Sequence, residues 1–201
     1  MRNNYPQIAL VWLSAAIISA VATHAPWRWS LDSALVRHGE WWRLITGHFV
    51  HLSRQHYQYD LLALGLTLAL CTTIGLSGTA IARTALLSAA VVSAALLLTH
   101  PVDIYGGLSG ITAGLLTRGT LQMINKGALL SGIILSLCLL FKILLEQRGV
   151  AVSGVAPVWQ AHAAGAVAAM TLAAYSWKQT KRTVSFSCRS LNNTFNTSST
   201  R

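Results

Sequence analysis

Long apolar runs separated by short polar stretches dominate this chain. A membrane-spanning helix needs roughly 20 mostly apolar residues, and six candidate runs are present. They cover residues 7–25, 56–76, 80–98, 104–117, 127–145 and 158–177. The pattern predicts an all-α, polytopic membrane protein with six transmembrane helices, folded as one domain over residues 1–177.

The fourth run is too short to cross a bilayer alone. Its residues lie between Asp103 and Arg118, and a helix rises only about 1.5 Å per residue. Either Arg118 lies within the bilayer, or the helix begins below the surface and the preceding loop dips into the membrane. Irregular backbone at that depth survives only where it is buried in protein or lines water. The glycine-rich segment 106–110 is therefore singled out by its position.

Two other segments depart from the pattern of spans. Residues 26–55 contain the tryptophans Trp27, Trp29, Trp41 and Trp42 and the arginines Arg28, Arg37, Arg43 and Arg54. Amphipathic aromatics and arginines favour the headgroup layer, so this segment is predicted to be an interfacial, partly helical first loop. Residues 178–201 are basic and rich in Ser, Thr and Asn, which is typical of a disordered tail.

Composition and charge support a membrane environment. The chain is 53% hydrophobic and only 10% charged, whereas soluble domains carry about 25% charged residues. The net charge of +10 does not predict a nucleic-acid partner, because the basic residues form no stripe with interleaved aromatics. With the N-terminus inside, nine Lys and Arg residues fall in inside segments and six in outside segments. This bias predicts that both termini are cytoplasmic and that the basic tail meets anionic lipid.

Polar side chains within apolar runs are functional candidates, because they are costly in a membrane. Ser109 lies between glycines near the start of the short fourth helix, and His162 lies among alanines in the sixth run. Flanking glycines expose backbone amides, and a helix N-terminus adds partial positive charge that suits an oxyanion. Both helices present small-residue faces that allow close approach. A Ser/His pair is therefore predicted, although each residue alone could serve a helix contact.

A metal site is the rival interpretation of the remaining polar residues. His56 and Asp60 are four residues apart on one helical face, with His48 and His51 just upstream. Histidine and carboxylate are zinc ligands. However, the chain contains no HExxH motif. We therefore predict no metal and no cofactor.

Three motifs, in this order along the chain, resemble the rhomboid family of intramembrane proteases. They are Trp42-Arg43 with His51 and His56-x-x-x-Asp60, then Gly107-Leu108-Ser109-Gly110, then Ala161-His162-x-x-Gly165. The resemblance extends over residues 41–177, most of the chain. Each motif alone is weak, and three in order on six spans are specific.

The resemblance implies a Ser109/His162 dyad without an acid, in a water-filled cavity open to the outer face. His56, Asp60, Gly107 and the Ser109 amide would stabilise the oxyanion. Asp60 stands where the family usually has asparagine. A carboxylate would repel an oxyanion, and only the neutral acid could donate a hydrogen bond to it. Ala113 stands where many rhomboids carry an aromatic that packs on the histidine.

Within the family, the compact core and the segment 41–48 look most like rhombosortases. This implies a bacterial inner-membrane enzyme whose active site opens to the periplasm. Its partners would be the lipid bilayer and a membrane-anchored protein with a single or C-terminal transmembrane helix. The expected substrate is a secreted protein whose C-terminal tail consists of Gly-Gly, an apolar helix and a basic end. The alternatives are a catalytically inactive rhomboid-like binding protein and, less favoured, a transporter that uses intramembrane His and Asp.

Overall fold

The computed structural model describes residues 5–99, 102–151 and 155–177, which are mostly helical. The elements are α1 (Tyr5–Thr23), α2 (Pro26–Trp29), β1 (Leu31–Asp32), α3 (Ser33–Arg37), α4 (Arg43–Thr46), the 3₁₀ turn η1 (Gly47–Phe49), α5 (Arg54–Thr73), α6 (Gly78–Thr99), β2 (Ile104–Tyr105), α7 (Ser109–Asn125) and α8 (Leu129–Gln147). A last helix covers residues 159–177. The predicted tail, residues 178–201, lies outside the described residues.

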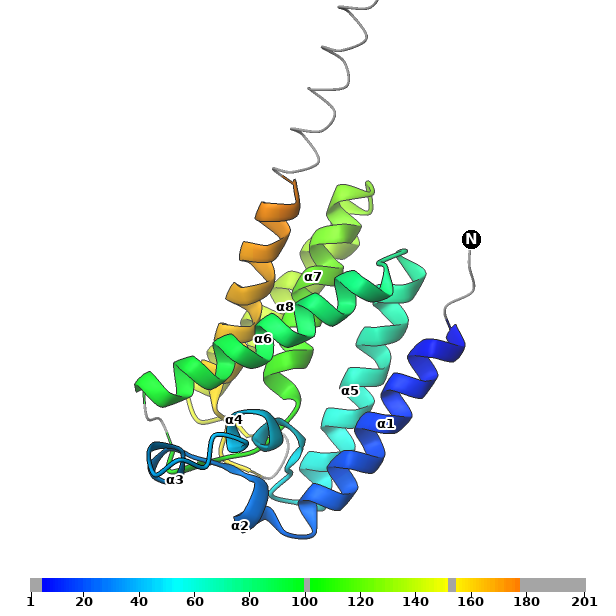
Figure 1. Cartoon of the computed structure of the whole chain (residues 1–201). Helices are drawn as coiled ribbons and strands as arrows, with labels where there is room; N and C mark the ends of the chain where they lie inside the picture. Colours follow the sequence, from blue (N-terminus) through cyan, green and yellow to red (C-terminus); the bar gives the residue numbers. More distant parts are fainter. Residues whose placement is uncertain (1–4, 100–101, 152–154, 178–201) are drawn as a thin grey trace, which may run out of the picture.

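The long helices run in alternating directions through one bundle (Figure 1). The start of α1 and the end of helix 159–177 lie at the same end of this bundle. The short elements α2, α3 and α4 gather at the opposite end, where the loops before α5 and α7 also lie. Helices that start and finish at the same end of a bundle cross it an even number of times, which agrees with this arrangement.

Three helices are long and apolar enough to cross a membrane by length and composition: Pro6–Thr23, Gly78–Thr99 and Leu129–Gln147. The helix α5 begins with the polar residues Arg54, Gln55 and His56, and α7 has 17 residues including Arg118. Three of the predicted spans thus have a matching apolar helix in the part of the chain that the structure describes. The full set of six stays a prediction.

The fourth predicted span differs from the apolar run at its start. The helix α7 begins at Ser109, not near residue 104. Residues 104 and 105 instead form β2, which pairs antiparallel with β1 so that Leu31 faces Tyr105 and Asp32 faces Ile104. This small ladder is absent from the all-α prediction, because it depends on pairing between distant segments. Its effect is to place Ser109 at the first turn of its helix.

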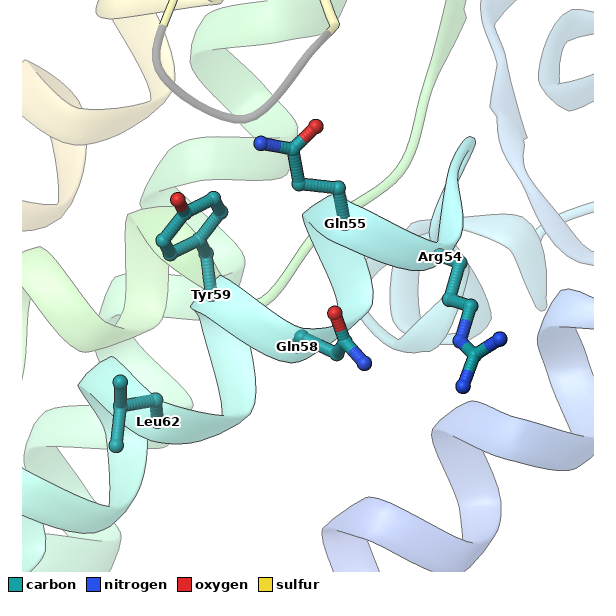
Figure 2. Close-up of a pocket in the computed structure, with 5 residues that line it drawn as sticks. All are labelled: Arg54, Gln55, Gln58, Tyr59 and Leu62. Atoms are coloured by element: carbon teal, nitrogen blue, oxygen red, sulfur yellow. The ribbon is translucent and has the colours of Figure 1, made fainter.

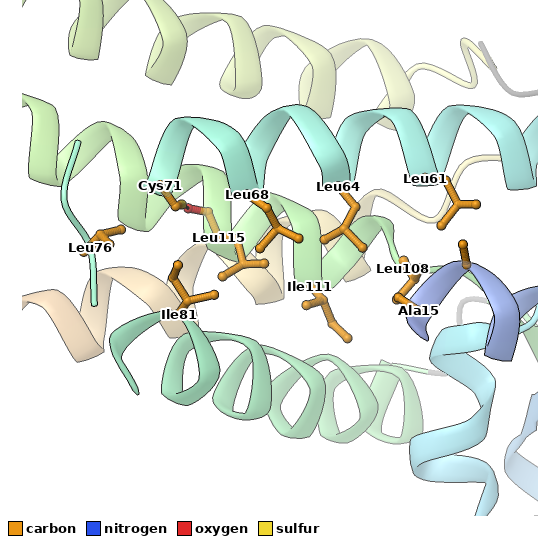
Figure 3. Packing of buried hydrophobic residues seen from close by; sticks show 11 residues of the cluster. Ala15, Leu61, Leu64, Leu68, Cys71, Leu76, Ile81, Leu108, Ile111 and Leu115 are labelled. Atoms are coloured by element: carbon orange, nitrogen blue, oxygen red, sulfur yellow. Dashed lines mark hydrogen bonds between the residues drawn. The ribbon is translucent and has the colours of Figure 1, made fainter. Parts of the chain in front are cut away.

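A buried apolar cluster holds α1, α5, α6 and α7 together (Figure 3). Leu64 and Leu68 of α5 meet Ile111 and Leu115 of α7, and Ile81 of α6 closes the cluster. The thiol of Cys71 is buried there and donates to the carbonyl of Leu115 at 3.5 Å. The helix that carries Ser109 is therefore the centre of the bundle, with neighbours on several sides.

The segment 26–55 is partly helical, as predicted, and Trp27, Trp41 and Trp42 are exposed on it. One of its arginines does not face a headgroup layer. Arg43 is only 4% exposed and donates to Ser30 O at 2.8 Å, to Trp27 O at 3.1 Å and to Glu40 at 2.6 Å. Its five-donor guanidinium satisfies carbonyls that no helix pairs, so Arg43 fixes the fold of this insertion.

Candidate active site

A cavity of about 730 Å³ lies between α5, α7, α8 and helix 159–177. Ser109 and His162 both line it, although they are far apart in sequence. His56 and Asp60 of α5 line the same cavity. Its remaining wall is largely apolar and includes Leu66, Leu70, Leu135 and Leu139. The structure therefore brings four of the five predicted site residues to one partly enclosed space, and Gly107 is not among its lining residues.

A second pocket, of about 580 Å³, lies along the first turns of α5 and contains none of the predicted site residues. Arg54, Gln55, Gln58, Tyr59 and Leu62 line it (Figure 2). Tyr59 also lines the larger cavity. The start of α5 thus carries several polar side chains, which make this helix less apolar than α1, α6 and α8.

Ser109 is the first residue of α7 and follows a tight loop. Gly107 has φ 146°, a conformation that side chains rarely adopt. A Cβ on Gly107 would lie 3.0 Å from His56 Nε2 and 3.2 Å from Asp60 Oδ2. Glycine is needed here both for the backbone angle and for the close approach of the loop to α5. This position places Gly107 against His56 and Asp60, and its role near the oxyanion stays a prediction.

Hydrogen bonds hold the loop before Ser109 in place. Gly107 N donates to Gly47 O at 3.2 Å, and the Tyr105 hydroxyl donates to Gly107 O at 3.0 Å. Leu108 N donates to Asp60 Oδ2 at 2.8 Å. The loop is therefore fixed to the insertion on one side and to α5 on the other, which positions the first turn of α7.

Asp60 is the meeting point of a buried polar cluster. Its Oδ2 lies 3.2 Å from His51 Nε2 and 3.4 Å from His56 Nε2, in addition to the bond from Leu108 N. Since the amide of Leu108 can only donate, this oxygen acts as an acceptor. The rings of His51 and His56 meet edge to face, 5.0 Å between centroids. This arrangement suits a carboxylate that orients the two imidazoles beside it. No role for His51 was predicted from the sequence.

His48 lies apart from this cluster. Its Nε2 is 3.0 Å from Ser93 Oγ and 3.2 Å from Ala89 O. Because Ser93 Oγ itself donates to Leu44 O, the imidazole of His48 is the donor in both contacts. Burial lowers the pKa of His48 to about 4, so this side chain is neutral at neutral pH. His48 therefore joins the insertion to α6 and does not complete a metal set with His51 and His56.

Helix 159–177 packs against α7 through glycine, as the small faces predict. A Cβ on Gly165 would overlap the carbonyl of Gly110, and a Cβ on Gly114 would lie 2.8 Å from Gly165 O. The predicted close approach of these two helices is confirmed. The two helices therefore carry Ser109 and His162 to the wall of the same cavity.

Ser109 and His162 share the cavity, but the hydrogen bonds of the described residues include none between them. Such bonds are often long in enzymes without substrate and shorten in the complex. Both side chains lie at or near the start of helices that touch at Gly110 and Gly165. The arrangement can support a serine nucleophile with a histidine base.

Sequence reasoning missed Glu146, which contacts His162. Glu146 Oε2 lies 2.5 Å from His162 Nδ1, and its other oxygen pairs with Lys142 Nζ. The predicted fifth span ends at Leu145, whereas α8 continues to Gln147, and this last turn carries the carboxylate. Two signals were available: the chain has only five acidic residues, and Glu146 follows Lys142 by four residues at the end of an apolar run.

The family model described as the rhomboid domain matches residues 38–179, a range that includes every candidate residue of the cavity. No curated protein matches the chain. The match covers well over half of the sequence.

Proposed function

Since the chain belongs to the rhomboid family, we propose that it is an intramembrane serine protease with Ser109 as nucleophile and His162 as general base. The family acts within the lipid bilayer, and the apolar helices make this chain a membrane protein. The single observation that supports the proposal most is the shared cavity, whose wall carries a serine at a helix N-terminus and a histidine from another helix.

The proposed reaction begins when Ser109 Oγ attacks the carbonyl carbon of the scissile peptide. The Ser109 proton passes to His162 Nε2, and a tetrahedral oxyanion forms. The C–N bond then breaks, and the leaving amine takes the proton from His162. Water next attacks the acyl-enzyme with His162 again as base, which releases the new C-terminus and restores the serine.

Charge stabilisation for the oxyanion would come from the start of α7 and from His56. The first amides of a helix lack intrahelical partners and carry partial positive charge. His56 lies against the loop at Gly107. Asp60 accepts the bond from Leu108 N, so in this proposal it supports the oxyanion site by holding the loop and His56, rather than by donating to the oxyanion itself.

Replacing Asp60 tests this supporting role. Asp60→Asn is expected to keep kcat/KM within about tenfold of wild type, because the amide oxygen can still accept from Leu108 N. Asp60→Ala leaves buried donors unsatisfied, at about 1–3 kcal/mol, and is expected to lower kcat/KM by roughly fivefold to 150-fold. Cleavage of a membrane-anchored reporter in proteoliposomes measures both. A fully active alanine variant beside an inactive asparagine variant would contradict the role.

The proposed substrate is a membrane-anchored protein with a single or C-terminal transmembrane helix. The apolar wall formed by Leu66 and Leu70 of α5 and Leu135 and Leu139 of α8 suits an apolar segment. Within this class we propose the rhombosortase type of substrate, a secreted bacterial protein that ends in Gly-Gly, an apolar helix and a basic end. The resemblance of residues 41–48 to rhombosortases supports it.

We place the protein in the bacterial inner membrane, with six spans and both termini in the cytoplasm. The start of α1 and the end of helix 159–177 lie at one end of the bundle, and the insertion lies at the other (Figure 1). The cavity is on the insertion's side, since α7 begins there with Ser109. It would therefore open toward the periplasm.

Covalent labelling tests the nucleophile directly. Detergent-solubilised wild-type protein is expected to react with a fluorophosphonate probe, because this reagent needs a serine activated by a base. Ser109→Ala is expected to give no labelling, while Ser136→Ala is expected to label as wild type, since Ser136 bonds to Gly132 O on α8 and does not line the cavity. An unlabelled but folded wild type would favour the inactive, substrate-binding alternative.

A further inference from the structure

Glu146 is placed where the acid of a catalytic triad lies relative to its histidine. Its carboxylate oxygen is 2.5 Å from His162 Nδ1, and a carboxylate can only accept, so Nδ1 carries the hydrogen. This leaves Nε2 as the basic nitrogen. The contact therefore selects the one neutral tautomer of His162 that can take a proton from Ser109.

The pair is well enclosed. The side chains of Glu146 and His162 are 10% and 8% exposed, so the interaction is little screened by solvent. Lys142, one turn earlier on α8, pairs with the second oxygen of Glu146 and is 47% exposed. A buried carboxylate needs such partners to remain ionised. Glu146 is thus held between a half-exposed cation and a buried imidazole.

Ala113 makes this contact more significant. No bulky side chain at that position of α7 can pack on the imidazole, so the described partners that orient His162 are on α8. Lys142 Nζ lies 3.4 Å from Nδ1 and 3.5 Å from Nε2 of His162. It therefore opposes positive charge on the ring, whereas Glu146 favours it.

We propose that Glu146 is a positioning residue that fixes the tautomer of His162 and stabilises the imidazolium formed during proton transfer. This rests on the proposed function, because it requires His162 to be the base for Ser109. It replaces a two-residue site with a Ser109–His162–Glu146 arrangement. The acid reaches the site from α8, and the positive charge of Lys142 offsets part of the negative charge that Glu146 presents to His162.

Substitution of Glu146 tests the proposal through the pH profile of kcat/KM. Glu146→Gln is expected to lower kcat/KM by roughly 10²-fold or more, within the about 3 × 10⁴ that removal of a triad acid causes in another serine protease. The acid limb of its profile should move to lower pH, because the imidazolium has lost its anion. Glu146→Asp is expected to recover part of the rate.

Lys142→Gln provides the opposite change on the same helix turn. Removing its charge favours the imidazolium, so the acid limb should move to higher pH. Apart from Lys142, Glu146 and His162, the ionisable or hydroxyl side chains that line the cavity are His56, Tyr59, Asp60, Thr67, Tyr105, Ser109 and Thr112. They are unchanged in both variants, so shifts in opposite directions report on Glu146 and Lys142. A purely structural role would not produce such a pair of shifts.

The controls separate this inference from the proposed protease activity. Gln147→Ala, an exposed neighbour of Glu146, is expected to retain wild-type activity. Activity that depends on Ser109 and His162 but is unaffected by Glu146→Gln would overturn the positioning role alone. Activity that survives Ser109→Ala would overturn the proposed function. We expect Glu146→Gln and Gln147→Ala to have equal thermal stability in detergent. A Glu146→Gln variant that loses rate while the acid limb of its pH profile stays in place would also overturn the inference.

Discussion

Replacing Ser109 with alanine is expected to lower proteolysis by about 10⁶, the loss that serine proteases show when the nucleophile is removed. The variant should fold and insert normally, because the change removes one oxygen from a half-buried residue. The loop that positions it is held by backbone bonds from Gly107 and Leu108, which the alanine leaves intact. A reconstituted protein with a membrane-anchored reporter gives the rate.

The control for Ser109→Ala is Ser136→Ala, which removes a hydroxyl outside the cavity. It should retain full cleavage. A Ser109→Ala variant that cleaves at the wild-type rate would exclude Ser109 as nucleophile and return the small-residue helix contact as its role. Melting temperatures of the two variants in detergent should agree with the wild type, which separates loss of chemistry from loss of fold.

Replacing His162 with alanine is expected to cause a loss as large as that of Ser109→Ala. A nucleophile without its base is no longer activated, so each single change removes the whole catalytic unit. The double variant should be no slower than either single variant. The alanine also leaves Glu146 without its imidazole partner, so some loss of thermal stability should accompany the loss of rate.

The rate in the double variant separates a catalytic from a structural histidine. If the rate loss of the double variant Ser109→Ala/His162→Ala equals the product of the two single losses, His162 acts independently of Ser109. His162→Gln serves as a further comparison, since it keeps a hydrogen-bond donor toward Glu146 and lacks a base. It should be inactive and more stable than the alanine variant.

The bundle was largely predictable because apolar runs determine where helices can lie in a bilayer. The start of α7 was not, because residues 104–105 pair with residues 31–32, and apolar residues in such a strand look like part of a helix. The role of Arg43 was also hidden. Two of its partners are the backbone carbonyls of Trp27 and Ser30, which leave no mark in the sequence.

The candidate site was only partly predictable. Ser109 and His162 stood out because glycines and alanines surround them, and the contact between Gly110 and Gly165 explains that composition. Glu146 did not stand out, because charges at helix ends are common in membrane proteins. Whether such a charge turns toward lipid headgroups or toward a histidine depends on the register of α8 against helix 159–177, which periodicity alone does not determine.

The insertion is attached to the loop before Ser109 by the β1–β2 ladder and by the bond from Gly107 N to Gly47 O. Movement of the insertion as an independent lid would therefore pull the loop before Ser109 out of place. Entry between α5 and α8, whose leucines line the cavity, would leave this loop undisturbed. A substrate helix would then reach the site by lateral diffusion in the membrane, and unfolding of its end near Ser109 would become the step that selects which helices are cut.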